Sequence, residues 1–337
     1  MCGIAGWINF SENLKSNSTI IKRMTETLER RGPDSEGVYE SENVLLGHRR
    51  LIVVDPEGGK QPMIKIIHGS KYVLVYNGEL YNTEELRKNL LEEGYAFDSY
   101  SDTEVLLMSY IACIKKFNGI FAFAIYDEDK GRVFLARDQM GVKPLFYSIN
   151  NKNIIFASEI KAILANPMVK AQVDRDGITE LFALGPAVTP GKTIYKNISE
   201  IAPANCMVIS KENIKVWEYW KVSLEENKET VEEAAEHVRT LVVDAIKRQL
   251  VGDVPICTFL SGGLDSSAIS AIAAEEFRNR GKVLDTYSID YKDNEKYFKS
   301  SLFQPTSDKY WACKVAEFIK SNHKNVVLNH KDLVLAL

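Results

Sequence analysis

The stretch that most constrains the fold lies in the second half of the chain, where seven residues join an apolar strand to a helix. A predicted buried strand at Val254–Leu260 leads into Ser-Gly-Gly-Leu-Asp-Ser-Ser at 261–267, and a helix rich in Ala and Ile follows. A glycine-rich turn at a helix N-terminus forms an anion cradle from backbone N–H groups and the helix dipole. The septet lacks the lysine and the spacer of a Walker A loop. Taken alone, Ser-Gly-Gly is equally a tight turn with a serine cap.

The elements around this septet continue as an alternating series. A helix is predicted at Val231–Leu250, a strand at Val283–Asp290, a helix at Ser307–Lys320 and a strand at Val326–Leu328. A β-α-β-α-β order predicts a doubly wound parallel sheet with its ligand at the carboxyl ends of the strands.

A second constraining feature is the cysteine at position 2. Removal of Met1 would leave Cys2 as the first residue, carrying both a thiol and a free α-amine. The ordinary pKa of a cysteine thiol is ~8.5 and that of an α-amine is ~7.7–8.0, so the amine can accept a proton at neutral pH. N-terminal amines activate nucleophiles for acyl chemistry in this way. Taken alone, an early cysteine is more often a small apolar residue of the core.

The first half of the chain is predicted to be dominated by sheets. Helices are predicted at 18–30, 82–93 and 102–111. Short segments rich in Phe, Ile and Val are typical of strands. Such strands are predicted at 4–10, 44–47, 64–67, 72–76, 119–127, 132–138 and 154–157. These elements predict two sheets covered by helices.

Three polar clusters interrupt these apolar segments. His-Arg-Arg-Leu at 48–51 and Asn-Gly-Glu-Leu-Tyr-Asn at 77–82 follow strands, while Tyr-Ser-Asp-Thr-Glu at 100–104 begins a helix. Singly, they are explained as a solvated arginine pair, a hairpin turn and a helix cap. Their combination with Cys2 reverses that interpretation and favours a functional site.

Composition and charge exclude several classes of protein. The chain has 42 basic and 46 acidic residues and a net charge of −4, which argues against a basic surface for nucleic acid. Five widely spaced cysteines without a CxxC pair indicate reduced thiols. No apolar run approaches the ~18–20 residues of a membrane span, and no secretory signal is seen. We therefore expect a cytoplasmic protein without nucleic-acid or membrane partners.

The ordered motifs in residues 2–200 resemble the glutaminase domain of class II, N-terminal-nucleophile glutamine amidotransferases. The resemblance includes Met-Cys-Gly-Ile at 1–4, Arg-Gly-Pro-Asp at 31–34 and the three polar clusters. It continues with Phe-Asn-Gly-Ile-Phe-Ala-Phe-Ala at 117–124, Arg-Asp-Gln-Met-Gly-Val-Lys-Pro-Leu at 137–145 and Ser-Glu-Ile-Lys-Ala at 158–162. The fold that it implies is an αββα sandwich.

This resemblance implies catalytic roles for Cys2, Asn77 and Gly78. Cys2 would attack the side-chain amide of glutamine and release ammonia, leaving a γ-glutamyl thioester that water cleaves. Asn77, through its side-chain amide, and Gly78, through its backbone N–H, match the family's oxyanion hole. Fixed donors of this kind stabilise the tetrahedral intermediate.

The same resemblance implies how glutamine is held. Arg50 would bind its α-carboxylate through a bidentate fork, whereas Arg49 has no such role. Asp102, helped by Glu79, would receive its ammonium group. A site that requires both the α-carboxylate and the ammonium group would select free glutamine over a peptide amide.

The septet resembles the pyrophosphate-binding loop of ATP pyrophosphatases, which form adenylates. The resemblance implies that serine hydroxyls and glycine amides hold phosphate oxygens and that Asp265 holds Mg²⁺–pyrophosphate. The side chains implied to flank the adenine are Leu260 and Ile289. The full set of implied ATP-binding residues is Leu260, Ser261, Gly262, Gly263, Asp265, Ser266, Ser267 and Ile289.

Together the halves resemble the family of glutamine-hydrolysing asparagine synthetases along all 337 residues. The resemblance implies that ATP with Mg²⁺ activates the β-carboxylate of aspartate as an adenylate. Ammonia then attacks, giving asparagine, AMP, pyrophosphate and glutamate. The expected division is a glutaminase domain at 2–205, a connecting segment at 206–230 and the N-terminal part of a synthetase domain at 231–337.

The expected fold class is thus an α+β N-terminal-nucleophile hydrolase sandwich followed by a truncated α/β doubly wound sheet, because family members continue beyond Leu337. We expect residues 1–337 to hydrolyse glutamine but to form little asparagine. The expected ligands are glutamine, aspartate and ATP, and a homodimer stays open. Two alternatives are another carboxylate acceptor, which ATP–pyrophosphate exchange would identify, and a non-catalytic scaffold.

Overall fold

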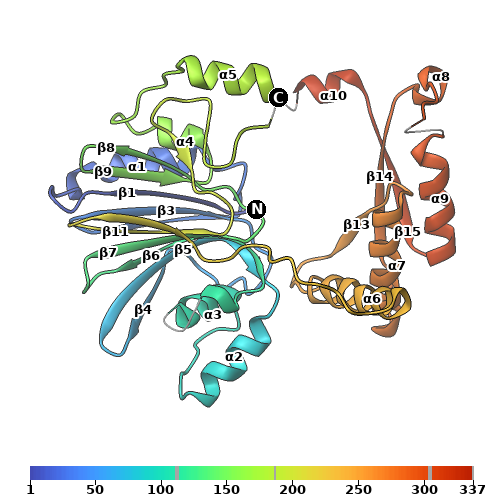
Figure 1. The fold of residues 1–337 in the computed structure, drawn as a ribbon, viewed down its shortest axis with the longest axis horizontal. Helices are drawn as coiled ribbons and strands as arrows, with labels where there is room; N and C mark the ends of the chain where they lie inside the picture. The colour runs from blue at the N-terminus through green and yellow to red at the C-terminus, as the bar shows by residue number, and fades with distance from the viewer. Residues whose placement is uncertain (111–113, 186, 303–305, 336–337) are drawn as a thin grey trace. The chain divides into compact units, whose positions relative to one another are not determined.

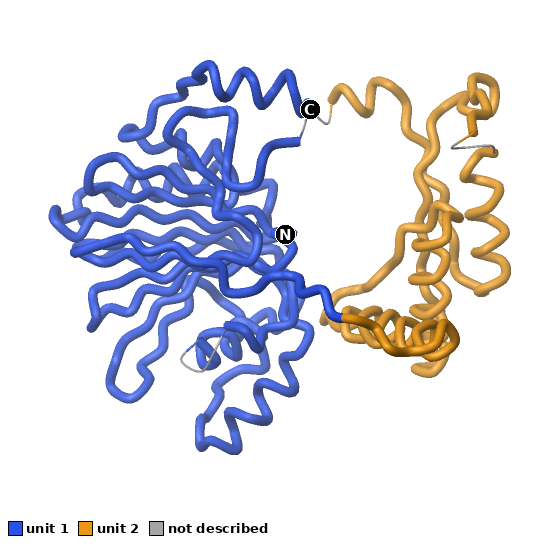
Figure 2. The backbone as a smooth tube through the Cα atoms, in the orientation of Figure 1, with its two compact units in different colours: residues 1–225 blue, residues 226–337 orange. Residues whose placement is uncertain are grey.

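The computed structural model describes residues 1–110, 114–185, 187–302 and 306–335. The chain forms two compact units, unit 1 at residues 1–225 and unit 2 at residues 226–337 (Figure 2). The predicted end of the helix at 102–111 lies outside the described residues.

Unit 1 contains two six-stranded antiparallel sheets stacked as layers (Figure 1). The first sheet has the order β10-β8-β9-β1-β3-β2 and the second has the order β12-β11-β7-β6-β5-β4. The strands of the first sheet are β1 (Gly3–Ile8), β2 (Ser35–Glu40), β3 (Val44–Arg50), β8 (Phe146–Asn150), β9 (Asn153–Ala157) and β10 (Ser199–Glu200). The strands of the second sheet are β4 (Met63–Ile67), β5 (Ser70–Leu80), β6 (Gly119–Asp127), β7 (Arg132–Arg137), β11 (Asn205–Ser210) and β12 (Ile214–Glu218).

Helices cover the outer faces of both sheets. On the first sheet, α1 contacts β1 and β3, and α4 contacts β9; on the second, α3 contacts β4 and β5, and α2 packs on α3. This arrangement confirms the predicted αββα sandwich (Figure 1). The helices of unit 1 are α1 (Ser18–Glu26), α2 (Thr83–Glu92), α3 (Asp102–Ser109), α4 (Ile160–Leu164) and α5 (Arg175–Leu184), with 3-10 helices at Lys15–Asn17 and Ile114–Lys116.

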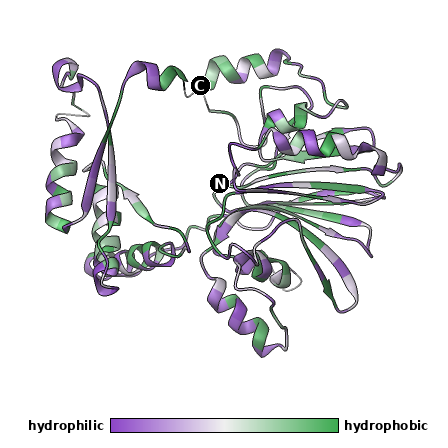
Figure 3. Ribbon diagram, turned by 180° about the vertical axis from the view of Figure 1, so that it is seen from behind, coloured by the Kyte–Doolittle hydropathy of each residue, from purple (hydrophilic) through white to green (hydrophobic). Residues whose placement is uncertain are grey.

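Three apolar clusters fill the spaces between these layers. One includes Ile4 and Val75 and lies between the two sheets. Phe123 belongs to the cluster between the second sheet and its helices, and Trp7 and Met24 belong to the cluster between the first sheet and its helices. A strand covered on both faces needs apolar residues at successive positions, which explains the continuous apolar runs of β5 and β6. Figure 3 shows these strands as mainly hydrophobic and α2 as largely hydrophilic.

Several strands of unit 1 are not predicted by the sequence. β2 and β8 contain mostly exposed or half-exposed residues, so neither forms a clear apolar run. β11, apart from its first residue Asn205, and β12 fall inside the predicted connecting segment at 206–230, yet they extend the second sheet of unit 1. The predicted domain boundaries themselves stay predictions.

Unit 2 contains a three-stranded parallel sheet with the order β13-β14-β15. Helices α7 and α9 contact each other and the sheet, while α6 packs on α7. A parallel sheet after an antiparallel sandwich confirms the predicted fold class. The elements are β13 (Cys257–Phe259), β14 (Asp285–Tyr291), β15 (Asn322–Leu328), α6 (Val231–Arg248), α7 (Leu264–Asn279), α8 (Asn294–Tyr297), α9 (Asp308–Ile319) and α10 (His330–Leu335).

The core of unit 2 is small. Leu250, Ala273, Leu284 and Ile319 belong to one buried cluster, and a second gathers around Leu260. Over the described ranges of the chain, no helix has both the length and the apolar character required to cross a membrane.

Candidate functional site

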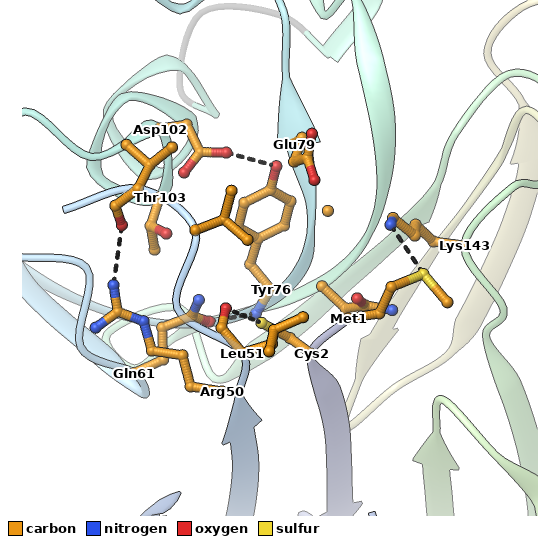
Figure 4. A pocket seen from close by; sticks show the side chains of 14 residues that line it. Met1, Cys2, Arg50, Leu51, Gln61, Tyr76, Glu79, Asp102, Thr103 and Lys143 are labelled. Atoms are coloured by element: carbon orange, nitrogen blue, oxygen red, sulfur yellow. Dashed lines mark hydrogen bonds between the residues drawn. The ribbon is translucent and has the colours of Figure 1, made fainter. Parts of the chain in front are cut away.

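A small pocket of about 90 Å³ lies at the start of β1 in unit 1 (Figure 4). The register of β1 and β3 pairs Gly3 with Arg49, which puts Cys2 beside Arg50 at the ends of these strands. Strand β5 contributes Asn77, and the first residue of α3 is Asp102. The pocket brings together all six residues that the sequence predicts for the glutaminase site: Cys2, Arg50, Asn77, Gly78, Glu79 and Asp102.

Cys2 lies partly buried in this pocket. Its Sγ is 3.7 Å from the carbonyl oxygen of Leu51, and its own carbonyl accepts a hydrogen bond from Arg31 Nε at 2.9 Å. Burial raises the pKa of the Cys2 thiol. Thiolate formation at neutral pH therefore requires a proton acceptor close to the sulfur.

Asn77 has a buried amide without a partner. The residue is 1% exposed, and neither Nδ2 nor Oδ1 has a hydrogen-bond partner among the described residues. Leaving such a group unpaired costs about 1–3 kcal/mol, so an unpaired amide in a pocket indicates a ligand-binding role. Beside it, a Cβ on Gly78 would lie 2.3 Å from the carbonyl oxygen of Ile120, so only glycine fits there.

The two neighbouring arginines at the end of β3 have different surroundings. Arg49 forms ion pairs with the exposed carboxylates of Glu29 and Glu36 at 3.7 and 3.1 Å. Arg50 is 5% exposed, and its Nη atoms donate to the carbonyl oxygens of residues 54, 55 and 56 at 3.1, 2.6 and 2.8 Å. These bonds use three of five N–H donors and hold the guanidinium in place. Arg50 therefore has donors left for an anionic ligand.

Asp102 supplies the negative charge opposite Arg50. Its Oδ2 accepts hydrogen bonds from the Tyr76 hydroxyl at 2.9 Å and from the Leu80 N–H at 3.2 Å. Burial raises the pKa of the Asp102 carboxyl, and these two bonds oppose the rise. The cap of α3 is Ser101, whose hydroxyl accepts from the Glu104 N–H, so the Asp102 carboxylate is free to face the pocket.

The pocket also contains residues to which the sequence assigns no role. Gln61 accepts a hydrogen bond from the Tyr76 N–H at 2.6 Å, and Lys143 Nζ lies 3.2 Å from Sδ of Met1. Lys143 falls inside a motif that carries the resemblance, at 137–145, and Arg31, which bonds to the Cys2 carbonyl without lining the pocket, falls inside another, at 31–34. Gln61 lies outside every such motif, and no signal in the sequence marks it.

In unit 2 the first three residues of the septet, 261–263, lie in the predicted turn between β13 and α7, and its last four residues begin α7. Gly262 has a φ of +83°, and a Cβ there would lie 2.5 Å from Cβ of Trp311. Both constraints require glycine. Gly263 precedes α7 and provides no side-chain cap, so the first N–H groups of this helix stay available.

The serine hydroxyls of this loop differ in their bonding. Ser261 and Ser266 share a hydrogen bond of 3.0 Å between their Oγ atoms, and Ser261 Oγ also lies 3.4 Å from the Gly263 N–H. Ser267 Oγ is buried and has no partner within the described part of the chain. An orphaned hydroxyl at a helix N-terminus fits a phosphate oxygen.

The remaining predicted residues of the ATP site are placed differently. Asp265 is exposed near the N-terminus of α7. Leu260 is 1% exposed and packs with Ala312 and Ala316, whereas Ile289 is 53% exposed. The structure therefore does not bring the side chains of Leu260 and Ile289 onto one accessible surface. Among the residues described, no group of three or more His, Cys, Asp or Glu side chains could hold a metal ion.

Comparison with known proteins identifies the family. Residues 1–220 match the family model described as a glutamine amidotransferase domain. The chain belongs to this glutamine amidotransferase family. Residues 237–337 match a second family model, described as asparagine synthase. These two matches confirm the resemblance seen in the sequence.

Two named relatives match nearly the whole of this chain. A glutamine-hydrolysing asparagine synthetase of Bacillus subtilis, numbered 3, is 52% identical over 99% of this chain and 55% of its own length. A putative asparagine synthetase of Methanocaldococcus jannaschii is 33% identical over 98% of this chain and 66% of its own length. The chain thus spans little more than half of the first relative.

A solved structure shares the fold at low sequence identity. An allosteric regulatory enzyme of purine biosynthesis is 15% identical, with a TM-score of 0.51, and the match covers 97% of this chain and 80% of that chain. This likeness concerns the fold alone.

Proposed function

We propose that the pocket of unit 1 hydrolyses the side-chain amide of glutamine and releases ammonia. The observation that carries this proposal is the buried, unpartnered amide of Asn77 in the same pocket as the Cys2 thiol. An oxyanion formed by attack of the sulfur would take the Asn77 and Gly78 N–H groups as its donors. Arg50 would bind the α-carboxylate, and Asp102 with Glu79 would bind the ammonium group of glutamine.

The proton balance of this reaction requires the free α-amine of Cys2, and therefore the removal of Met1. The amine accepts the thiol proton as sulfur bonds to the amide carbon, and then gives that proton to the departing nitrogen as ammonia forms. Water cleaves the resulting thioester to glutamate. Met1 lines the pocket and is 55% exposed, so processing would also enlarge the space for glutamine.

For the full-length protein we propose asparagine synthesis from aspartate, with this ammonia as the nitrogen source. The support is the match of unit 2 to asparagine synthase and the names of the relatives. ATP, when bound, supplies the adenylyl group that activates the β-carboxylate of aspartate, and ammonia displaces AMP. Amidation of another carboxylate by the same architecture is the alternative acceptor chemistry.

The loop of unit 2 fits the phosphates of ATP. The orphaned Ser267 hydroxyl and the uncapped N-terminus of α7 both favour an anion. Mg²⁺ is often bound by one or two carboxylates together with substrate phosphates, a role that Asp265 could fill. Magnesium binding, a homodimer, a cytoplasmic location and the domain limits at 205 and 230 stay predictions.

The test of the glutaminase proposal is Cys2→Ala, with Cys257→Ala as the matched control. Cys257 is an exposed cysteine of unit 2. We expect glutamine hydrolysis to fall at least ~1000-fold in Cys2→Ala, as with loss of other catalytic nucleophiles, and to stay unchanged in the control. Intact mass after treatment with a glutamine-analogue electrophile should show loss of Met1 and one adduct on Cys2. Equal hydrolysis by the parent and Cys2→Ala would overturn the proposal.

A further inference from the structure

Lys143 is a buried cation of the pocket that the proposed reaction does not use. It lies between β7 and β8, lines the pocket with Cys2, and is only 4% exposed. Lysine is almost never fully buried without a paired anion. Among the described residues, the one hydrogen-bond partner of its ammonium is the thioether of Met1, with Nζ 3.2 Å from Sδ (Figure 4). A thioether is a weak acceptor, and it leaves with Met1.

The backbone of Lys143 is fixed by the motif that contains it. The carboxylate of buried Asp138 accepts hydrogen bonds from the N–H groups of Met140, Val142 and Lys143 at 3.1, 2.9 and 2.9 Å. The Lys143 carbonyl accepts a bond from Arg137 Nε at 2.8 Å. Hydrogen bonds within the segment at 137–145 therefore hold the backbone from which the Lys143 side chain reaches the pocket.

The N-terminal amine lies among four charged or titratable groups, and Lys143 is one of them. Burial lowers the pKa of the Met1 amine; Cys2 opposes this, Lys143 and Arg31 lower the pKa further, and Glu79 raises it. Removal of Met1 would transfer the free amine to Cys2, one residue closer to the reacting sulfur.

Of the two cations near the chain start, Lys143 is the one whose charge is not balanced by an ion pair among the described residues. Arg31 is paired with Glu159 at 3.0 Å and also bonds to a backbone carbonyl. Lys143 has no ion pair in the part of the chain that the structure describes; burial lowers its pKa, Glu79 raises it, Arg31 lowers it, and Cys2 and Asp138 raise it. The charge of Lys143 is therefore opposed without an ion pair, by the carboxylates of Glu79 and Asp138.

We propose that Lys143 is a positioning residue of the glutaminase site, whose buried ammonium keeps the freed α-amine of Cys2 unprotonated. This inference rests on the proposed glutaminase function. Two cations in one desolvated pocket disfavour each other, so the amine stays neutral and able to accept the thiol proton. Lys143 itself forms and breaks no bond in the reaction.

The test compares Lys143→Met, which removes the charge at similar length, with Lys143→Arg, which keeps it. The measured quantity is kcat/KM for glutamine between pH 5.5 and 9.5 in the processed full chain. Loss of the cation raises the pKa of the amine, so the acid limb moves to higher pH. We expect activity at pH 6.5 to fall about tenfold in Lys143→Met, for a shift of about one pH unit, and to recover by pH 9. Lys143→Arg should keep the parent profile.

A second measurement needs no turnover. Competitive acetylation of the Cys2 amine with acetic anhydride, followed by mass spectrometry, gives its titration curve directly. We expect the curve of Lys143→Met to move to higher pH. This readout separates failure of the inference from failure of the proposed glutaminase, because it holds even for a parent that does not hydrolyse glutamine.

Two results would overturn the inference. An equal loss of activity at every pH together with a lower Tm would show a purely structural role. A raised KM with an unmoved acid limb would show that Lys143 acts on substrate binding instead. Lys143→Gln replaces Lys143→Met if the latter does not fold.

Discussion

The pocket of unit 1 and the serine–glycine loop of unit 2 differ in how far their functional groups are fixed before a ligand arrives. In the pocket, Arg50 and Asn77 are 5% and 1% exposed. In the loop, Ser261 and Asp265 are exposed, and neighbouring Leu264 is 87% exposed. One site presents buried side chains in set positions, and the other presents backbone and hydroxyl groups on a surface turn.

The supporting structure differs in the same way. The pocket is built from strands of two six-stranded sheets whose apolar clusters are buried on both faces. The loop rests on a three-stranded sheet, and α6 of the same unit has no buried residue. Groups that stabilise a short-lived oxyanion must be positioned in advance, which requires rigid elements. A cradle of N–H groups can instead close around a phosphate that supplies most of the charge.

The largest effect expected within the pocket is that of Asn77→Ala. Removal of the unpartnered amide should lower kcat for glutamine hydrolysis by about 10²–10³-fold with little change in KM, because the proposed role of the amide is to stabilise the oxyanion. Steady-state kinetics with Asn213→Ala as control would test this, since Asn213 is exposed beside the β11–β12 turn. A loss smaller than tenfold would show that the pocket is not preorganised around Asn77.

The next largest effect is expected for Arg50→Lys, compared with Arg49→Lys. Lysine cannot hold the three carbonyl oxygens and still present a planar fork, so KM for glutamine should rise by roughly 10–100-fold. Arg49 forms ion pairs with exposed carboxylates, which contribute about 0–1 kcal/mol. Its substitution should leave KM within about twofold. Similar effects of the two substitutions would contradict the assignment of the carboxylate site to Arg50.

In the loop, Asp265→Asn should have a smaller effect, which is limited to ATP binding. We expect binding of Mg²⁺–ATP to the full-length protein, measured by calorimetry, to weaken about tenfold through loss of one charged contact. Glu275→Gln is the matched control, because Glu275 is an exposed residue of the same helix, α7. Glutamine hydrolysis should stay unchanged in both variants. Unaltered ATP binding in Asp265→Asn would remove the magnesium role from this residue.

The sequence predicts which residues line the pocket better than it predicts the hydrogen bonds that these residues form. Taken singly, Arg50 and Asn77 are explained as a solvated arginine and part of a hairpin turn, and it is the resemblance carried by the ordered motifs that implies one site for both. The partner of each group depends on packing between distant segments. Gln61 receives its bond from β5 only after the two segments meet, and nothing in its local sequence indicates that contact.

The same limit explains why some strands are not predicted from the sequence and why the type of a side chain can leave its role undecided. β2 is an edge strand held by pairing with β3, and its residues alone show no strand pattern. Leu260 ends an apolar strand, so its type is compatible with either an adenine contact or a core position. Leu260 packs against Ala312 and Ala316 in this structure, and its contact with adenine stays a prediction.

The smallest expected effect concerns stability and separates the binding role of Asp102 from its structural role. Burial raises the pKa of the Asp102 carboxyl above its value in the unfolded chain, so the charged form is disfavoured in the fold at every pH above that unfolded value. Asparagine carries no charge, and its Oδ1 can accept the bonds from Tyr76 and Leu80. Asp102→Asn should therefore raise Tm at pH 7 by up to about 3 °C while raising KM for glutamine.

The pH dependence of Tm tests whether the Asp102 charge is the cause of the expected rise. Below about pH 3 the carboxyl is protonated in both the folded and the unfolded chain, so the difference in Tm between the parent and Asp102→Asn should vanish there. Asp98→Asn is the control, because Lys65 lowers the pKa of Asp98 and its charge therefore favours folding. That control should show no rise in Tm at pH 7. A lower Tm for Asp102→Asn at pH 7 would mean that the carboxylate stabilises the fold. The pocket would then not hold a buried binding group at a cost in stability, and this part of the contrast with the exposed loop of unit 2 would fail.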